Sequence, residues 1–339
     1  MLAIVILNWN GADMLERYLP SVMAHSTHAD IIVADNSSSD ESLDLLRREF
    51  PSVRIIQFDR NFGFAEGYNR AFDILKEEEK YDDYLLLNSD VEVTPLWLNP
   101  LREYMKAHPE VAACQPKIRS ARRRGIFEYA GACGGFIDFY GYPFCRGRVM
   151  STVEKDEKQY DDVMSVMWAT GACLYIRAKD WHDVGGLDPN FFAHQEEIDL
   201  CWRLRSRGRG VVCIPQSVVY HVGGGTLPKS NPKKTMLNFR NNLLMLYKNL
   251  PEEDLEKVMK KRKWLDAVAA LKELFTGHMD DYRAIRRARK EFKRKKASYA
   301  AIRKENMAQR TVDDIPERKK FSLLAQYYIF RHKKFSQLP

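Results

Sequence analysis

The sequence predicts an α/β protein in which a mostly parallel central sheet is flanked by helices. Strand-like and helix-like segments alternate through the N-terminal part of the chain. Each predicted strand there also ends in polar residues, as strands do when they deliver side chains to one edge of a sheet. A third observation concerns the other end of the chain, where the residues from about 232 onward show helical patterns and a basic composition.

The N-terminal elements follow in order. Short apolar runs rich in β-branched residues predict strands at 2–7, 30–35, 53–58 and 84–88. Amphipathic stretches between these runs predict helices at about 12–24, 40–49 and 64–79. Since strands that alternate with helices pair in parallel, we expect four parallel strands with their carboxyl ends at one edge.

The middle of the chain is less regular. A helix is expected at about 95–107 and a strand near 111–117, followed by irregular β structure over 126–177. A helix at 178–184, another that begins near Glu196, and a short strand ending at His221 complete the predicted body.

Charge divides the chain into two parts. The net charge is +8, yet residues 232–339 carry 28 Lys and Arg against 13 Asp and Glu, so residues 1–231 are mildly acidic. We therefore expect a globular domain at 1–231 and a basic, mainly helical extension at 232–339. A basic extension seeks phosphate, whether in nucleic acid, anionic lipid or a substrate.

Other features bear on location. The start of the chain leads directly into a predicted strand and has no signal-peptide pattern, and no apolar stretch is long enough to cross a bilayer. The six cysteines are scattered without a CxxC pair, which is typical of reduced thiols in the cytosol. These features indicate a cytoplasmic protein.

The segment 84–90 reads Tyr-Leu-Leu-Leu-Asn-Ser-Asp, so a buried strand ends in Asn88 and the carboxylate of Asp90. A lone hard carboxylate at a strand tip suits Mg²⁺ or Mn²⁺ that also binds substrate phosphates. The alternative, about equally probable for this segment alone, is a strand followed by an Asp in a turn.

The other predicted strands end in Asn8-Trp9-Asn10, in Asp35, and just before Asn61. Together these ends predict a pocket at the carboxyl edge of the sheet. Gly63 and Gly67 lie at the start of a helix, where glycine lets the backbone approach a ligand or make a tight turn. The chain lacks both GxGxxG after its first strand and a P-loop, which argues against a dehydrogenase or a P-loop enzyme.

A second group of acids comprises Glu196, Glu197 and Asp199 near the start of a predicted helix. The first turn of a helix stabilises ionised carboxylates, so the acids could be catalytic or could simply cap the helix. Further along, His221 is followed by three glycines. A lone histidine is usually structural, but a glycine loop beside it favours contact with a ligand.

Taken together, these segments resemble family 2 glycosyltransferases, which have the GT-A fold, and in particular bacterial rhamnosyltransferase-like enzymes of surface polysaccharide synthesis. The matching segments lie at 5–10, 33–40, 61–69, 86–90, 171–173, 186–203 and 221–226. They occur in the order seen in the family and span residues 1 to about 226, so the set is far more specific than any one motif.

The resemblance implies a role for each residue. Asp90 would bind Mg²⁺ or Mn²⁺ on the donor diphosphate, and His221 would help hold the metal or the leaving group. Glu197 occupies the place of the family's catalytic base, although Glu196 remains an alternative. The residues expected to line the nucleotide pocket are Asn8, Asn10, Asp35, Asn61, Gly63, Asn69 and Asn88.

Two departures from the family pattern matter. Asn88 stands where the metal motif has its first acid, which leaves less negative charge for the ion. Glu197 stands where the base is Asp, which moves the carboxylate about one methylene further. The implied chemistry is an inverting, in-line displacement, which needs one general base and a Lewis acid but no covalent nucleophile.

The implied partners are a UDP- or dTDP-linked sugar and a glycan or lipid-linked acceptor. The basic extension would rest on an anionic inner membrane surface, or be a solvated appendage that packs on the body or dimerises. We expect no nucleic acid partner, since the extension lacks interleaved aromatic residues. The rival functions are a sugar-phosphate nucleotidyltransferase, a non-catalytic basic binding protein and an inactive relative kept for assembly.

Overall fold

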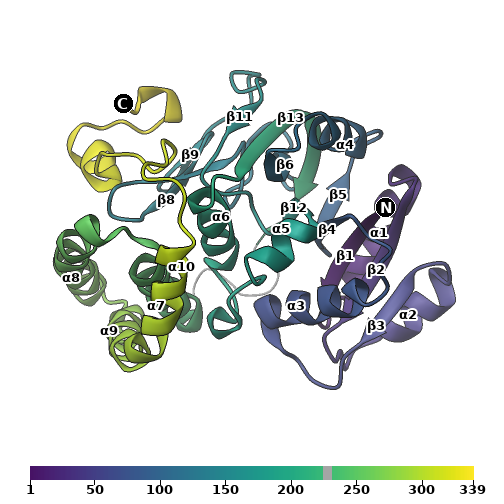
Figure 1. The fold of residues 1–339 in the computed structure, drawn as a ribbon, viewed down its shortest axis with the longest axis horizontal. Coiled ribbons are helices and arrows are strands. Elements are labelled where there is room, and N and C mark those ends of the chain that lie inside the picture. The colour runs from purple at the N-terminus through teal and green to yellow at the C-terminus, as the bar shows by residue number, and fades with distance from the viewer. Residues whose placement is uncertain (224–230) are drawn as a thin grey trace.

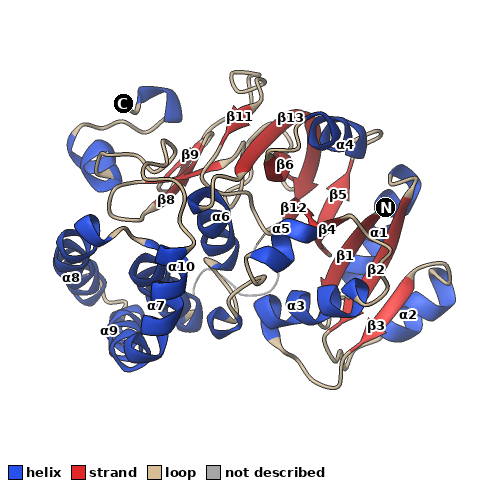
Figure 2. Ribbon diagram, viewed as in Figure 1, coloured by secondary structure: helices blue, strands red, loops and turns tan. Residues whose placement is uncertain are grey.

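The computed structural model describes residues 1–223 and 231–339. Within these ranges a sheet of nine strands forms the centre of the molecule, with helices on both of its faces (Figure 2). Its first half consists of parallel strands in the order β4-β1-β2-β3. Their bounds are Leu2–Asn8 (β1), Ala29–Asp35 (β2), Arg54–Gln57 (β3) and Asp83–Asn88 (β4). The four predicted parallel strands are therefore confirmed, and each strand end lies within one residue of its predicted position.

The second half of the sheet is mixed. Strand β12 runs antiparallel to both β4 and β6, whereas β13 runs parallel to β6 and antiparallel to β5 and β11. The bounds are Val91–Val93 (β5), Val111–Ser120 (β6), Met164–Ser165 (β11), Cys173–Arg177 (β12) and Gly210–His221 (β13). The short strand expected before His221 is thus the end of a longer one. An irregularity between Ile214 and Val218 interrupts its pairing and hid its length in the sequence.

The helices of the body lie close to their predicted positions. They are Ala12–His25 (α1), Ser42–Glu49 (α2), Gly63–Lys76 (α3), Leu98–Ala107 (α4), Ala178–Asp183 (α5) and Glu196–Ser206 (α6), with a 3₁₀ turn at Pro189–Phe191 (η1). The irregular β region contains a small antiparallel sheet. Its strands are Gly135–Ile137 (β7), Pro143–Cys145 (β8), Arg148–Val149 (β9) and Thr152–Val153 (β10).

Strand β1 shows how the core is divided. Ala3 and Val5 point into one hydrophobic cluster, and Ile4 and Ile6 point into another on the opposite face. This alternation follows from the two-residue period of a strand. Because both faces are covered, the strand reads as a continuous apolar run in the sequence.

The extension begins with four helices, gathered at the opposite end of the molecule from β3 (Figure 1). They are Pro232–Asn249 (α7), Glu252–Phe275 (α8), Met279–Lys295 (α9) and Ala300–Ala308 (α10), with a 3₁₀ turn at Lys296–Tyr299 (η2). After α10 the chain is mostly irregular, with a π turn at Ala325–Ile329 (η3) and a 3₁₀ turn at Phe335–Gln337 (η4). The extension is therefore mainly helical, as expected, with its α-helices confined to residues 232–308.

The extension shares a core with the body. Leu243, Leu246 and Tyr299 belong to the same hydrophobic cluster as Ala3 and Val5 of β1. A domain boundary at residue 231 remains a prediction, but the helices beyond it are packed on the body. None of the described helices has both the length and the apolar content that a bilayer crossing requires.

Candidate active site

The carboxyl ends of β1 and β2 bring Asn8 and Asp35 side by side. Asn8 Nδ2 donates to Asp35 Oδ1 at 3.1 Å and to Ser38 Oγ at 3.1 Å, and Ser38 N donates to Asp35 Oδ2 at 2.9 Å. Asn8 and Asp35 are buried, and the hydrogen bond to Ser38 Oγ is partly buried. Asn8 Oδ1 is also buried and has no hydrogen-bond partner among the described residues, so it is an acceptor left unsatisfied at this edge.

Asn10 joins the loops that follow these two strands. Its backbone has a φ of 51°, its N–H donates to Ser38 Oγ at 2.9 Å, and its Oδ1 accepts from Ser39 N at 2.7 Å. Asparagine tolerates this left-handed conformation better than most residues. Asn10 therefore fixes the loop after β1 against the loop after β2.

The loop after β3 is tied to the same edge. Asn61 Oδ1 accepts from Gly63 N at 2.8 Å and from Asn36 Nδ2 at 3.1 Å. Gly63 has a φ of 79°, and a Cβ on it would lie 2.5 Å from the Phe192 ring. Glycine is therefore required here for both conformation and space, so that the start of α3 can approach the segment before α6.

Asn69 lies further along α3, and both ends of its amide are engaged. Its Nδ2 donates to Leu187 O at 2.8 Å and its Oδ1 accepts from Leu187 N at 2.9 Å. It thus fixes the loop after α5. The structure does not bring Asn69 into contact with Asn8 or Asp35. To bind a nucleotide, as predicted, Asn69 would have to break its two hydrogen bonds to Leu187.

The tip of β4 forms a cluster with the end of β13. Asp90 Oδ1 lies 3.1 Å from His221 Nε2, and Asn88 Nδ2 lies 3.3 Å from the same nitrogen. Gly223 N donates to Asp90 Oδ2 at 3.1 Å. On the other side of the imidazole, Glu128 Oε1 lies 3.7 Å from His221 Nδ1. The structure therefore brings Asn88, Asp90 and His221 together, and their roles in binding the metal and the nucleotide remain predictions.

Electrostatics hold this cluster in an ionised state. Burial lowers the pKa of His221, but the hydrogen bond to Asp90 and the charges of Asp90 and Glu128 outweigh burial and raise this pKa to about 10. For Asp90 burial acts in the opposite direction and raises the pKa, but the hydrogen bond and charge of His221 bring that pKa below its ordinary value. Glu128 was not predicted, because it lies in the irregular region where no periodicity marks a functional position.

A metal ion would have to share this cluster with a substrate. Among the described residues, no three His, Cys, Asp or Glu side chains are arranged as a cage for a metal ion. A carboxylate oxygen and an imidazole nitrogen next to each other do suit Mn²⁺ or Mg²⁺ when phosphate oxygens complete the coordination. The residues therefore fit an ion that arrives with a diphosphate. Binding through Nε2 would require His221 to lose its proton. Gly224, Gly225 and Thr226, which follow His221 in the predicted motif, lie outside the described residues.

The second group of acids lies at the start of α6. Glu196 Oε2 and Glu197 Oε2 are both buried without a hydrogen-bond partner in the described part of the chain. Burial raises the pKa of Glu197 to about 7. Burial, followed by the neighbouring Glu197 charge, raises the pKa of Glu196 well above its ordinary value. Glu197 is therefore the acid of this pair that ionises near neutral pH.

Asp199, the third acid, has a structural role. It is fully buried and accepts from Arg203 Nε at 3.1 Å, Lys248 Nζ at 2.9 Å and Asn249 Nδ2 at 2.7 Å. Lys248 also pairs with Asp188 at 2.8 Å. This cluster of charges ties α6 to α7, so it connects the body to the extension.

The segment before α6 has an unusual backbone. Phe192, His194 and Gln195 have φ values of 64°, 72° and 75°, in the left-handed region that non-glycine residues avoid. Asn241 of α7 holds this segment, since its Nδ2 lies 3.0, 2.9 and 2.8 Å from the carbonyl oxygens of Phe191, Ala193 and His194. Non-glycine strain of this kind persists only where surrounding contacts enforce it.

A neighbouring asparagine extends this support. Asn242 Nδ2 donates to Gln195 Oε1 at 3.1 Å and to Gly141 O at 2.8 Å. The sequence had suggested only an apolar helix here, but four asparagines between positions 238 and 249 were a signal, since buried amides need partners. Figure 1 shows α6 between the extension helices and the central sheet, so the extension contributes to the site.

One short segment connects the two groups of acids. Ala172 O accepts from Asn88 N at 3.0 Å, and a Cβ on Gly171 would lie 3.8 Å from Glu197 Cβ. The strand tip with Asp90 and the helix start with Glu197 therefore adjoin the same segment, 170–172. If Asp90 and Glu197 lay on opposite sides of the molecule, they could not belong to one active site.

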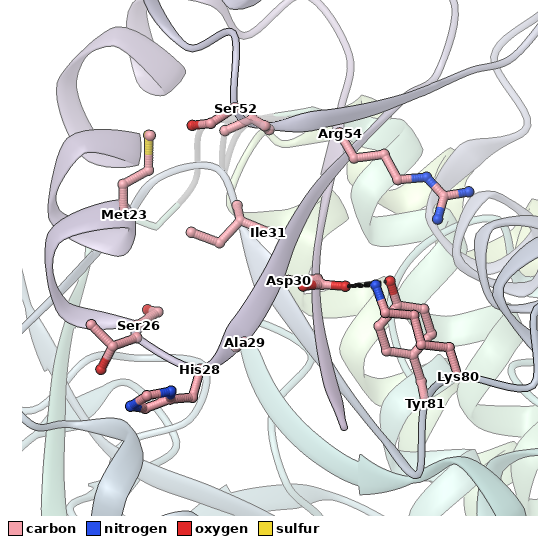
Figure 3. A pocket seen from close by; sticks show the side chains of 12 residues that line it. Met23, Ser26, His28, Ala29, Asp30, Ile31, Ser52, Arg54, Lys80 and Tyr81 are labelled. Atoms are coloured by element: carbon pink, nitrogen blue, oxygen red, sulfur yellow. Dashed lines mark hydrogen bonds and ion pairs between the residues drawn. The ribbon is translucent and has the colours of Figure 1, made fainter.

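A cavity at the other edge of the sheet is separate from this site. It has a volume of about 500 Å³ and lies at the amino ends of β2 and β3, lined by Asp30, Arg54 and Tyr81 among others (Figure 3). Asp30 there pairs with Lys80 and accepts from Tyr81. Since none of the predicted site residues lines this cavity, it has no part in the chemistry of the two acid groups.

Comparison with known proteins identifies the fold and the family. Residues 3–141 match the family described as "Glycosyl transferase family 2". This region of the chain is identified by the match as a family 2 glycosyltransferase sequence. The matched region contains the ends of β1 to β4, and the resemblance found in the sequence is therefore confirmed.

Among relatives of this family 2 chain, the N-acetylglucosaminyl-diphospho-decaprenol L-rhamnosyltransferase of Mycobacterium tuberculosis is 28% identical over 237 residues, which cover 65% of this chain and 76% of the relative. The rhamnosyltransferase WbbL of Escherichia coli is 24% identical over 226 residues, covering 65% of this chain and 83% of WbbL. Both alignments extend well beyond residue 141, since each includes more than 200 residues.

Solved structures confirm the GT-A fold. GalNAc-T7, crystallised with UDP, GalNAc and Mn²⁺, has a TM-score of 0.55 at 17% identity, with 73% of this chain and 47% of that chain covered. The mannosyltransferase PcManGT of Pyrobaculum calidifontis, in complex with GDP-Man and Mn²⁺, has a TM-score of 0.50 at 10% identity, with 91% and 85% covered. At these identities the likeness concerns the fold alone.

Proposed function

We propose that this family 2 glycosyltransferase transfers a sugar from a nucleotide diphosphate to a hydroxyl of a lipid-linked or polysaccharide acceptor, with inversion. The observation that carries the proposal is the shared segment 170–172, which adjoins both the strand tip with Asp90 and the helix start with Glu197. A transferase of this kind needs an anchor for the diphosphate and a base for the acceptor within one site.

The β1–β2 edge would receive the nucleotide. Asp35 and Asn10 shape this edge, and the free Oδ1 of Asn8 offers an acceptor to a base or ribose. Asn61 and Gly63 position the start of α3 beside it. UDP and dTDP are the nucleotides suggested by the resemblance, and neither is favoured by the geometry.

The β4 tip would receive the diphosphate. Asp90 and His221 are the residues that would hold Mg²⁺ or Mn²⁺, and a bound ion would supply Lewis-acid stabilisation of the leaving diphosphate. Without an ion, the His221 imidazolium would itself place a positive charge beside the phosphates. Asn88 Nδ2 lies 3.3 Å from His221 Nε2 and would donate to this nitrogen when the imidazole is neutral.

Glu197 would act as the general base. A pKa of about 7 suits proton transfer at neutral pH, and its unpartnered Oε2 is free to accept a proton from an acceptor hydroxyl. Burial and the neighbouring Glu197 charge raise the pKa of Glu196 well above its ordinary value, which makes Glu196 the weaker candidate for the base. The asparagines of α7 would fix the position of the base.

Two measurements test this function. A thermal-shift screen of nucleotide sugars with and without Mn²⁺ should show stabilisation by the true donor, strengthened by the metal. Asp90→Ala and Glu197→Gln should each abolish transfer while the protein stays folded, and Glu196→Gln should retain it. Near-normal turnover in either of the first two variants would contradict the assignment.

The resemblance also points to where the enzyme would work. The rhamnosyltransferase relative from Mycobacterium tuberculosis is named for a decaprenol-linked substrate. By analogy, this enzyme would work in the cytoplasm on the inner face of the membrane, with the basic extension near anionic lipid.

A further inference from the structure

Helix α8 buries two charged residues against the protein and exposes several large apolar residues to solvent. Its buried positions are Val258, Arg262, Asp266 and Ala270, so two of the four are charged. Arg262 and Asp266 are 2% and 0% exposed, respectively. On the outer side, Trp264 is 71% exposed, Val268 62%, Leu271 48% and Phe275 84%. A helix on the surface of a soluble protein normally shows the opposite arrangement.

The buried charges have partners within the protein. Arg262 contacts Asp266 at 3.2 Å and donates to Tyr140 O at 2.9 Å, and it also bonds Asn242 Oδ1. Arg289 of α9 completes the pairing at Asp266. Because Asn242 in turn bonds Gln195, the inward face of α8 belongs to the framework that supports the active site. The outward apolar residues have no such role.

These apolar residues form one continuous stripe. Trp264, Val268, Leu271 and Phe275 are separated by four, three and four residues, so they lie on one side of the helix over roughly 16 Å. Figure 1 shows α8 at the outer edge of the helical cluster, where a planar surface could reach it. An exposed apolar stripe of this kind marks an interaction site.

Lysines surround the stripe. At about 100° per residue, Lys257, Lys260 and Lys261 continue the same side of the helix toward its N-terminus. Lys263 and Lys272 lie on either flank. All five side chains belong to exposed residues. The outer face of α8 therefore combines an apolar half, which includes a tryptophan, with a half that carries the three lysines together with Glu253 and Glu256, the latter paired with Lys260.

We propose that α8 docks on an anionic lipid bilayer, with Trp264, Val268, Leu271 and Phe275 in the boundary between headgroups and acyl chains and the lysines at lipid phosphates. Tryptophan favours this boundary, and lysine extends its ammonium to the headgroups while its stem stays on apolar ground. The inference deepens the membrane part of the proposed function and identifies the surface responsible.

Charge argues against a second copy of the chain as the occupant. In a symmetric antiparallel contact, Lys257, Lys260 and Lys261 would cover the partner's apolar stripe, and in a parallel contact they would face the same lysines. Glu253 and Glu256 lie among these lysines, and both arrangements would still bury more ammonium groups than carboxylates, at a desolvation cost. An anionic bilayer instead offers phosphates beside an apolar layer.

Vesicle flotation of the full chain tests the proposal. The protein should float with vesicles of phosphatidylcholine and phosphatidylglycerol at low salt, much less with phosphatidylcholine alone, and less at high salt. Exchanging Trp264 and Phe275 together for serine should weaken binding roughly tenfold or more. Each of Lys260→Gln and Lys261→Gln should weaken it about fivefold. Leu96→Ser is the matched control, because Leu96 is equally exposed but lies outside the extension.

A fluorescence measurement adds an independent test of insertion. The parent protein should show a blue shift of tryptophan emission with anionic vesicles, and Trp264→Phe should lose that shift while still floating. Equal flotation of the parent and the Trp264/Phe275 double variant would overturn the proposal. So would a double variant that changes from dimer to monomer with vesicle binding unaltered, since the stripe would then be a protein interface.

The same samples separate this inference from the proposed function. The Trp264/Phe275 double variant should keep the parent's thermal-shift response to the stabilising nucleotide sugar, because the stripe does not contact the site. Loss of flotation with that response intact supports the docking surface. A parent protein that floats but responds to no nucleotide sugar would leave the docking surface standing and refute the transferase assignment.

Discussion

Replacing Asn241 with alanine would remove the side chain that holds the strained segment before α6, the helix that carries the proposed base. The Asn241 amide is fully buried, and its Nδ2 lies within hydrogen-bonding distance of three backbone carbonyls at positions 191, 193 and 194. An amide nitrogen carries two hydrogens, so at least one of these bonds is shared. Alanine at position 241 would leave buried carbonyl groups without donors.

The size of the effect follows from these contacts. Each unsatisfied buried carbonyl costs about 1–3 kcal/mol, so two of them reduce the free energy of unfolding by about 2–6 kcal/mol. The three left-handed residues, Phe192, His194 and Gln195, store strain of about 1 kcal/mol or more each. Since the released strain is comparable to the lost bonding, the segment should relax and displace the start of α6. A displacement of about 1 Å at a catalytic group costs about 100-fold in rate.

Three measurements follow. Chemical denaturation gives the loss in stability. The rate of sugar transfer from the donor found by thermal shift gives the loss in kcat. Amide hydrogen exchange reports the segment directly, because Phe64 N and Ala65 N both donate to Phe192 O. Asn241→Asp should be worse than Asn241→Ala, since a carboxylate would face the same carbonyl oxygens without donating to them.

Asn306→Ala is the matched control. Asn306 is also a buried amide that bonds the extension, with Nδ2 3.0 Å from Asn249 Oδ1, but it does not touch the segment before α6. It should lose stability and keep kcat below its melting temperature. If Asn241→Ala and Asn306→Ala lost similar stability and both kept kcat, the idea that α7 positions the base would be refuted.

Three further perturbations extend the test. The pKa of about 7 for Glu197 predicts that kcat/KM falls as pH drops through about 7, because the carboxylate is the active form. Since this folded-state pKa lies above the unfolded value, ionisation of Glu197 destabilises the fold as pH rises from the unfolded pKa through about 7. At pH values well above 7, Glu197→Gln should therefore have a higher Tm than the parent protein, whereas well below pH 5 the two Tm values should be similar. A Tm difference between variant and parent that does not change with pH would contradict the buried acid. Lys248→Met would leave Asp188 buried without its cation and Asp199 with Arg203 alone, and should cost about 3–5 kcal/mol in denaturation, whereas Lys260→Met on the exposed face should cost less than about 1 kcal/mol. Gly63→Ala should destabilise more than Gly185→Ala, because both have φ near +80° but only Gly63 would place a Cβ against Phe192, and equal losses would show that the Phe192 contact is unimportant.

Much of the fold could be predicted because its periodicities are local. The four parallel strands and the helices between them appear in the sequence as apolar runs and amphipathic stretches, and the strand-end motifs follow directly from them. Strand β13 was underestimated because an irregularity between Ile214 and Val218 breaks its pairing. Glu128 could not be predicted, since its proximity to His221 depends on a loop without periodicity.

The sequence by itself determined the class of fold, the family resemblance and the candidate acids at the strand tip and helix start, because each depends on short-range patterns of residue type. Only the tertiary structure decided that Asp199 is a structural acid, that asparagines of α7 hold the segment before α6, and that α8 presents its apolar side to solvent. Those assignments depend on which side chains meet across long separations in the chain. Periodicity alone does not specify such contacts, because it identifies a face of a helix without identifying what covers it.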